Sequence, residues 1–170
     1  MNRFSFILLP AIVFILLTSS FIPKSNCLEL EATTAEKMDK LLKNENKKYK
    51  FLYFFTTWCY ECNESLDHIS QIQSNSKLSK KYDFINIALD DDLKKLKKYS
   101  KENNQNKSKI YYFGTQKETA QFFLITKIGY NNAVPYYCIL DNSNNIVIDG
   151  YFELSDIEKY LEGVSRVPSS

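Results

Sequence analysis

Histidine is nearly absent from the sequence, whose 170 residues include only His68. A zinc site built around Cys59 and Cys62 would need two further ligands from a chain with four cysteines in all. Covalent haem attachment requires a histidine directly after the second cysteine of a Cys-x-x-Cys pair, a position that Asn63 occupies here. We therefore expect neither a metal nor a cofactor.

The sequence also lacks an excess of charge of either sign. Its formal net charge is +2, and Arg3 and Lys24 are the only charged residues within 1–27, so the rest of the chain carries 20 basic and 20 acidic residues. Lysines are interleaved with acids, as where Asp90, Asp91 and Asp92 precede a run of lysines. This pattern indicates solvated surfaces and marks no face for nucleic acid.

Proline and glycine are scarce as well, with four of each. Pro135 is the only proline between Lys24 and Val167, and the sequence has no internal repeats. With 44% apolar residues, a chain of this length fits one domain whose core does not depend on disulfides. We place that domain at residues 28–170.

The first 27 residues differ in kind from the rest. Arg3 gives a positively charged start, and residues 4–17 are apolar with two exceptions. This is the pattern of an export signal, with small residues that permit cleavage after Ser20 or after Cys27. An uncleaved anchor is the alternative, since the apolar stretch approaches the roughly 20 residues that span a bilayer. We expect a signal peptide or signal anchor at 1–27 and an exported protein, periplasmic, secretory or extracellular, in contact with a membrane only if this segment is uncleaved.

One stretch combines a strand-like run, a cysteine pair and a helix-like run. Residues 50–55 form an apolar run of strand length, which indicates a central strand buried on both faces. Cys59 and Cys62 follow, and apolar residues then recur every three or four positions to about Ser74, as in an amphipathic helix. At the start of a helix, both sulfurs lie on one face, within the Cα separation that a disulfide requires. We expect a Cys59–Cys62 disulfide.

The position of this pair favours dithiol chemistry. The free N–H groups and positive dipole end of a helix stabilise an anion, here the nucleophilic thiolate of Cys59. Glu61 opposes ionisation of the sulfurs through its like charge, so we interpret it as a redox-tuning residue that makes the dithiol more reducing. The alternative is a plain structural disulfide in an exported protein. Trp58, the position between strand and helix, and Pro135 favour exchange.

The remaining apolar patterns predict alternating helices and strands. Capping boxes precede three helical patterns, and a turn-forming cluster at 141–145 joins two apolar runs as an antiparallel hairpin. A polar loop is expected over 100–108. We expect helices near residues 34–44, 59–74, 92–99, 116–128 and 156–162, and strands near 50–55, 83–89, 110–113, 136–140 and 146–151. This order predicts a layered α/β arrangement.

These features together resemble the thioredoxin superfamily, over about residues 33–163. The resemblance is carried by Trp58-Cys59-Tyr60-Glu61-Cys62 after a buried strand, by Val134-Pro135 directly before a strand, and by the closing hairpin and helix. It implies a thioredoxin fold, with a central mixed β-sheet flanked by helices and a cis peptide bond at Pro135. The strand-helix insertion at 110–128, before that proline, is similar to that of exported or membrane-tethered bacterial thioredoxin-like reductases.

The resemblance also implies roles for individual residues. Cys59 and Cys62 would be catalytic. The segments around the dithiol would bind the substrate chain through Trp58, Tyr60, Val134, Pro135 and Tyr136. Packing in the core is the alternative for Trp58, and packing in the sheet is the alternative for Tyr136.

Three positions depart from the family pattern. Tyr53 stands six residues before the first cysteine, where ordinary thioredoxins have an acid that accepts a proton. Glu61 stands where many relatives have proline or histidine, and Tyr136 where a small threonine is frequent. Outside the motif, we interpret Cys138 as a small buried thiol.

The sequence thus predicts an exported thiol–disulfide oxidoreductase that exchanges disulfides with protein substrates, in the reductase or isomerase direction. Its partners would be protein thiols or disulfides and an upstream electron donor or acceptor. Cytochrome maturation, through reduction of haem-binding cysteines, would be a special case. The alternative is a non-enzymatic thioredoxin-fold subunit of an exported or translocation assembly, which the missing acid at Tyr53 and the bulky Tyr136 favour slightly.

Overall fold

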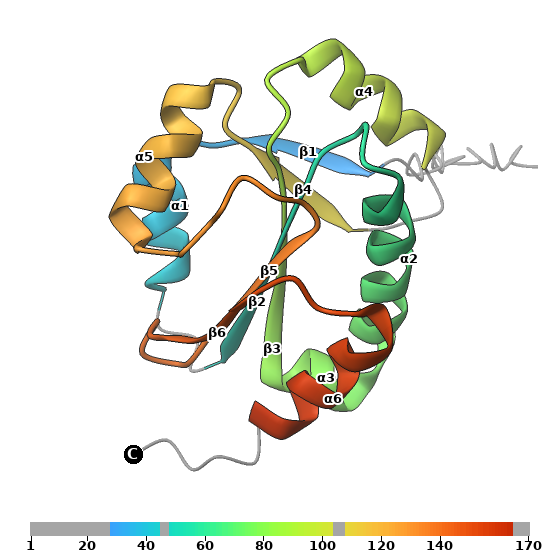
Figure 1. Cartoon of the computed structure of the whole chain (residues 1–170), viewed down its shortest axis with the longest axis vertical. Helices are drawn as coiled ribbons and strands as arrows, with labels where there is room; N and C mark the ends of the chain where they lie inside the picture. The colour runs from blue at the N-terminus through green and yellow to red at the C-terminus, as the bar shows by residue number, and fades with distance from the viewer. Residues whose placement is uncertain (1–27, 45–47, 104–107, 165–170) are drawn as a thin grey trace, which may run out of the picture.

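The computed structural model describes residues 28–44, 48–103 and 108–164, which form a sheet with helices on both faces (Figure 1). The predicted signal or anchor at 1–27 lies outside the described residues. Within the described ranges, no helix combines the length and the apolar character needed to cross a bilayer.

The sheet has the order β1-β4-β3-β2-β5-β6. Its first four strands in this order run parallel, whereas β5 is antiparallel to β2, and β6 to β5. The predicted mixed sheet and closing hairpin are therefore confirmed. The strands are β1 (Glu29–Ala32), β2 (Tyr49–Phe55), β3 (Tyr82–Ala88), β4 (Lys109–Tyr112), β5 (Tyr136–Leu140) and β6 (Ile146–Gly150).

Strand β2 is interior to the sheet, between β3 and β5, and every residue of it except Tyr49 is buried. Side chains alternate between the two faces of a strand. Phe51, Tyr53 and Phe55 accordingly belong to one apolar cluster and Leu52 and Phe54 to the other. The central strand expected from the sequence is confirmed.

Helices α1 and α5 cover one face of the sheet, and α2, α3, α4 and α6 contribute to the core on the other (Figure 1). The core on the second face includes both Cys59 and Cys62. The helices are α1 (Ala35–Leu42), α2 (Tyr60–Ser74), α3 (Ser76–Lys81), α4 (Leu93–Glu102), α5 (Gln116–Thr126) and α6 (Leu154–Val164).

Two elements were not predicted from the sequence. Strand β1 is a four-residue edge strand, and helix α3 has a single buried residue, Leu78. The prediction that residues 100–108 form a loop is wrong at its start, because α4 continues to Glu102. Buried Tyr99 and Ser100 hold this last turn, with Ser100 Oγ donating to Leu28 O at 2.6 Å.

Candidate functional site

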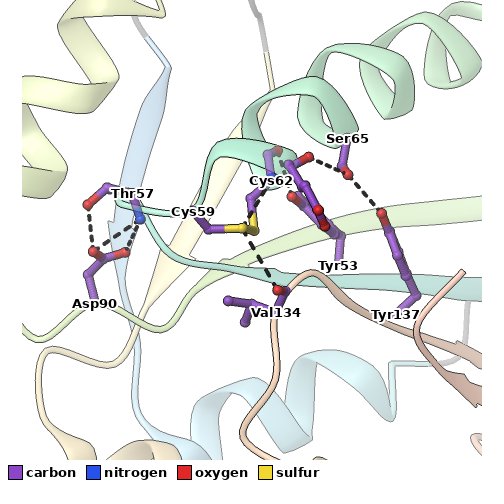
Figure 2. The surroundings of a disulfide bond; sticks show 9 residues. Tyr53, Thr57, Cys59, Cys62, Ser65, Asp90, Val134 and Tyr137 are labelled. Carbon is purple, nitrogen blue, oxygen red and sulfur yellow. Dashed lines mark hydrogen bonds between the residues drawn. A yellow bond between two sulfur atoms is a disulfide. The ribbon is translucent and has the colours of Figure 1, made fainter. Parts of the chain in front are cut away.

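The cysteine pair lies where the central strand passes into helix α2. Cys59 is the N-cap of α2, and its Sγ accepts a hydrogen bond from the Cys62 N–H at 3.2 Å. The two residues are joined in a disulfide, with Cα atoms 5.2 Å apart (Figure 2). The Cys62 N–H of the first helical turn therefore points toward Cys59 Sγ, an arrangement that stabilises negative charge on that sulfur.

The two cysteines differ in exposure. Cys59 is 8% exposed and Cys62 is fully buried, so Cys59 is the sulfur nearer to solvent. Trp58 and Tyr60, on either side of Cys59, are 76% and 75% exposed. Two large aromatic side chains thus stand in solvent next to the more accessible sulfur.

Strand β5 brings the Val134–Pro135 segment to the cysteines. Because β5 is antiparallel to β2, its first residues lie beside the last residues of β2, where α2 begins. The Val134–Pro135 peptide bond is cis, as expected from the resemblance, and Pro135 is buried. Cys59 Sγ lies 3.9 Å from Val134 O (Figure 2). A reduced Cys59 thiol is placed to donate to this carbonyl.

Tyr136 has a different environment. Its side chain is 4% exposed and belongs to the core under α1 and α5, on the face of the sheet opposite the cluster that includes the cysteines. Its hydroxyl donates to Asp149 Oδ2 at 2.9 Å, and burial, together with this carboxylate, raises the pKa of Tyr136. A substrate contact by Tyr136 would have to come through its backbone.

Tyr53 lies behind the disulfide, fully buried, and its hydroxyl donates to Cys62 O at 2.7 Å (Figure 2). Burial raises the pKa of Tyr53, so the phenol stays neutral and does not replace the carboxylate of ordinary thioredoxins as a proton acceptor. Next to it, Tyr137 donates to Ser65 Oγ at 2.9 Å, and Ser65 Oγ donates to Glu61 O at 2.8 Å. These bonds hold the first turns of α2 on the sheet.

Asp90 is a site residue that sequence reasoning missed. The sequence groups it with Asp91 and Asp92 as acids of a solvated surface, and of these three Asp92 is the N-cap of α4. The Asp90 carboxylate instead accepts bonds from Thr57, at 2.6 Å from Oγ1 to Oδ1 and 2.9 Å from the backbone N to Oδ2 (Figure 2). This clasp ties the loop after β3 to the loop that leads into the cysteines. No sequence motif predicts the contact between Thr57 and Asp90, because only the pairing of β2 with β3 brings the two residues together.

Glu61 is exposed in the first turn of α2. Its expected redox-tuning role stays a prediction. Among the described residues, no group of three or more His, Cys, Asp or Glu side chains is arranged to hold a metal ion.

Comparison with known proteins gives one family match. A protein-family model described as Thioredoxin-like matches residues 46–146, which is more than half of the chain. A comparison with curated proteins finds no match.

Several solved bacterial structures share the fold. The exposed lipoprotein thioredoxin Etrx1 from Streptococcus pneumoniae superposes with a TM-score of 0.58 at 18% identity, over 72% of this chain and 89% of that one. A putative thiol:disulfide interchange protein DsbE from Chlorobium tepidum gives a TM-score of 0.56 at 16% identity, over 73% and 82%. The thioredoxin domain of a thiol–disulfide oxidoreductase from Bacteroides vulgatus gives 0.54 at 15%, over 72% and 83%. At these identities the likeness shows the fold.

Proposed function

Because the chain belongs to the Thioredoxin-like family, we propose that it is a thiol–disulfide oxidoreductase that exchanges disulfides with protein substrates through Cys59 and Cys62. The observation that carries the proposal is the disulfide itself. It lies at the N-terminus of α2 with the Val134 carbonyl 3.9 Å from Cys59 Sγ. A purely structural disulfide needs neither the exposed Trp58 beside it nor the neighbouring cis-proline segment.

In the reductive direction, the Cys59 thiolate attacks one sulfur of a partner disulfide and the other partner sulfur leaves as a thiolate. The deprotonated Cys62 sulfur then attacks Cys59 Sγ, forming the Cys59–Cys62 disulfide and releasing the second partner thiol. Two electrons and two protons pass from the dithiol to the partner. The Cys59–Cys62 disulfide in the structure is the oxidised product of these two steps. An upstream dithiol donor would restore the reduced enzyme. The greater exposure of Cys59 supports its role as the attacking sulfur.

We propose the reductase or isomerase direction because Glu61 places negative charge within the first turn of α2, where it opposes the thiolate form. Export, to the periplasm or the secretory pathway, is proposed from the apolar N-terminal sequence. The exposed lipoprotein thioredoxin among the neighbours is consistent with that location.

Reduction of insulin by dithiothreitol tests the activity. The wild-type protein should accelerate the reaction, and Cys59→Ser should reduce the acceleration to background, because the attacking sulfur is gone. The matched control is Cys138→Ala, which removes a buried cysteine outside the pair and should retain the activity. Equal acceleration by wild type and Cys59→Ser would refute the exchange mechanism.

A trapping experiment separates this proposal from a non-enzymatic scaffold. Cys62→Ala leaves Cys59 able to attack but removes the resolving sulfur, so mixed disulfides with substrate proteins should accumulate and disappear on reduction. The same trap with Cys59→Ser added should accumulate none. A Cys62→Ala protein that captures no partner in the extract of its own source would favour a docking subunit.

A further inference from the structure

Two surface hollows border the cysteine pair. The first, here the Trp58 hollow, has a volume of about 500 Å³ and lies among the loops after β2 and β3, helix α5 and the loop before β5. The second, here the Glu61 hollow, has a volume of about 380 Å³ and lies among the start of α2, Pro135 and the loop between β6 and α6. Trp58 directly precedes Cys59 and Glu61 directly precedes Cys62, so each hollow is lined by a chain neighbour of one of the two cysteines.

The charges in the hollows are strongly biased toward negative. Six carboxylates line them: Asp90, Asp91 and Asp92 in the Trp58 hollow, and Glu61, Glu64 and Glu153 in the Glu61 hollow. Lys95 is the only basic side chain among the described residues that line either one. The chain after residue 27 has equal numbers of acidic and basic residues, so the acidic excess of these hollows does not reflect the composition of the whole chain.

The acids of the Glu61 hollow are not neutralised by neighbours. Glu61, Glu64 and Glu153 are exposed, and none of them belongs to an ion pair found in the described part of the chain. In the other hollow, Asp90 and Asp92 accept hydrogen bonds from backbone N–H groups, and Lys95 pairs only loosely with Asp92, at 3.9 Å.

Aromatic side chains stand among these carboxylates. Trp58 is 76% exposed in the first hollow and Tyr151 is 57% exposed in the second. An ammonium or guanidinium group is attracted both to a carboxylate and to the face of an aromatic ring, whereas an anion is repelled by the first and gains nothing from the second. The combination fits cationic side chains on both sides of a bound cysteine.

Building on the proposed function, we propose that the partner of this dithiol is a cationic polypeptide segment, with lysine or arginine residues flanking the cysteine that exchanges with Cys59. The acidic hollows attract such a segment and disfavour anionic disulfides. The chemical step is unchanged: the dithiol is oxidised to the Cys59–Cys62 disulfide as the partner disulfide is reduced to two thiols.

Three small disulfides that differ in charge test the proposal. The pre-reduced protein is mixed with cystamine, which is dicationic, with hydroxyethyl disulfide, which is neutral, or with dithiodipropionate, which is dianionic. Each rate is divided by the rate of dithiothreitol with the same disulfide, which removes intrinsic differences in reactivity. At low salt, the cystamine rate should exceed the dithiodipropionate rate by about tenfold, and high salt should shrink this preference toward about twofold.

A pair of charge variants assigns the preference to the site. In Glu61→Gln/Glu153→Gln, the ratio of the cystamine rate to the dithiodipropionate rate should fall by about threefold. Any change in the intrinsic reactivity of the dithiol affects both substrates and cancels in this ratio. The control Glu102→Gln/Glu162→Gln removes the same charge from the C-terminal turns of α4 and α6, about one helix length from the hollows, and should leave the ratio unchanged.

The outcomes separate the two proposals. Reduction of hydroxyethyl disulfide with a charge ratio near one, or in favour of dithiodipropionate, overturns the cationic partner and leaves the oxidoreductase intact. An equal fall of the ratio in the control variant also overturns it, because the effect would then come from net charge. A protein that reduces none of the three disulfides faster than Cys59→Ser overturns both.

Discussion

The clasp between Thr57 and Asp90 should contribute measurably to the stability of the loop that presents the cysteines. The perturbations are Thr57→Val, which removes the hydroxyl while keeping the side-chain shape and the backbone N–H, Asp90→Ala, and the two combined. The 2.6 Å bond from Thr57 Oγ1 to Asp90 Oδ1 is a hydrogen bond to a charged acceptor. Such bonds contribute about 1.5–3 kcal/mol, and the half-buried position of both residues reduces this to about 1–2 kcal/mol.

A double-mutant cycle isolates this bond. Asp90→Ala alone should be the more destabilising single change, since it also removes the acceptor of the Thr57 backbone N–H. The coupling energy between the two substitutions should be about 1–2 kcal/mol, because residues that share a hydrogen bond are not additive.

The assay is urea unfolding of the oxidised protein, followed by circular dichroism. With a slope of about 2 kcal/mol per molar urea, a loss of about 1.5 kcal/mol moves the midpoint down by about 0.7 M. A coupling energy below about 0.5 kcal/mol would refute the reasoning, since it would mean that the two side chains act independently.

Three further results are expected. Tyr53→Phe removes the donor to Cys62 O and should lower the unfolding free energy, measured by thermal denaturation, by about 1 kcal/mol. The control Tyr60→Phe, at an exposed position, should leave the unfolding free energy unchanged. Equal effects of the two variants would contradict the role of the buried bond. Burial raises the pKa of Cys138, so iodoacetamide should label Cys59 of the reduced native protein and reach Cys138 only after unfolding, and peptide mass spectrometry that finds both labelled together would contradict this. Burial is the main cause that raises the pKa of Tyr137 from 10.0 to about 12, so the folded state favours the neutral phenol. The folding stability that this shift contributes is complete below pH 10 and is lost as the pH rises toward 12. Urea unfolding above pH 10 should show a steeper loss of stability in wild type than in Tyr137→Phe, by up to about 1.4 kcal/mol per pH unit, and identical slopes would contradict the shift.

The elements predicted correctly are those whose patterns are local and strong. The apolar run of β2 and the turn cluster between β5 and β6 each carry their signal within about ten residues, and both are confirmed. The Cys-x-x-Cys spacing at the end of a buried strand pointed to the same disulfide that the structure has.

The missed elements are stabilised by distant partners. Strand β1 is short and half charged, and it forms because its backbone pairs with β4, about 80 residues later. Asp90 could not be distinguished from its two acidic neighbours, since only the pairing of β2 with β3 places it opposite Thr57. Which face of the sheet the Tyr136 side chain lies on depends likewise on how β5 pairs in the sheet. The sequence does not specify this face, because every residue of β5 is buried and no polar residue alternates with the apolar ones.

The contact between Cys59 and Val134 joins residues 75 positions apart in the chain. During synthesis, the cysteine motif is therefore made well before strand β5, which lies beside it in the folded protein. Until β5 docks against β2, the sulfurs lack the neighbouring carbonyl, and the Glu61 hollow lacks the loop before α6. The proposed exchange thus requires the finished sheet, and a chain truncated before residue 134 would retain both cysteines without the Val134 carbonyl beside them.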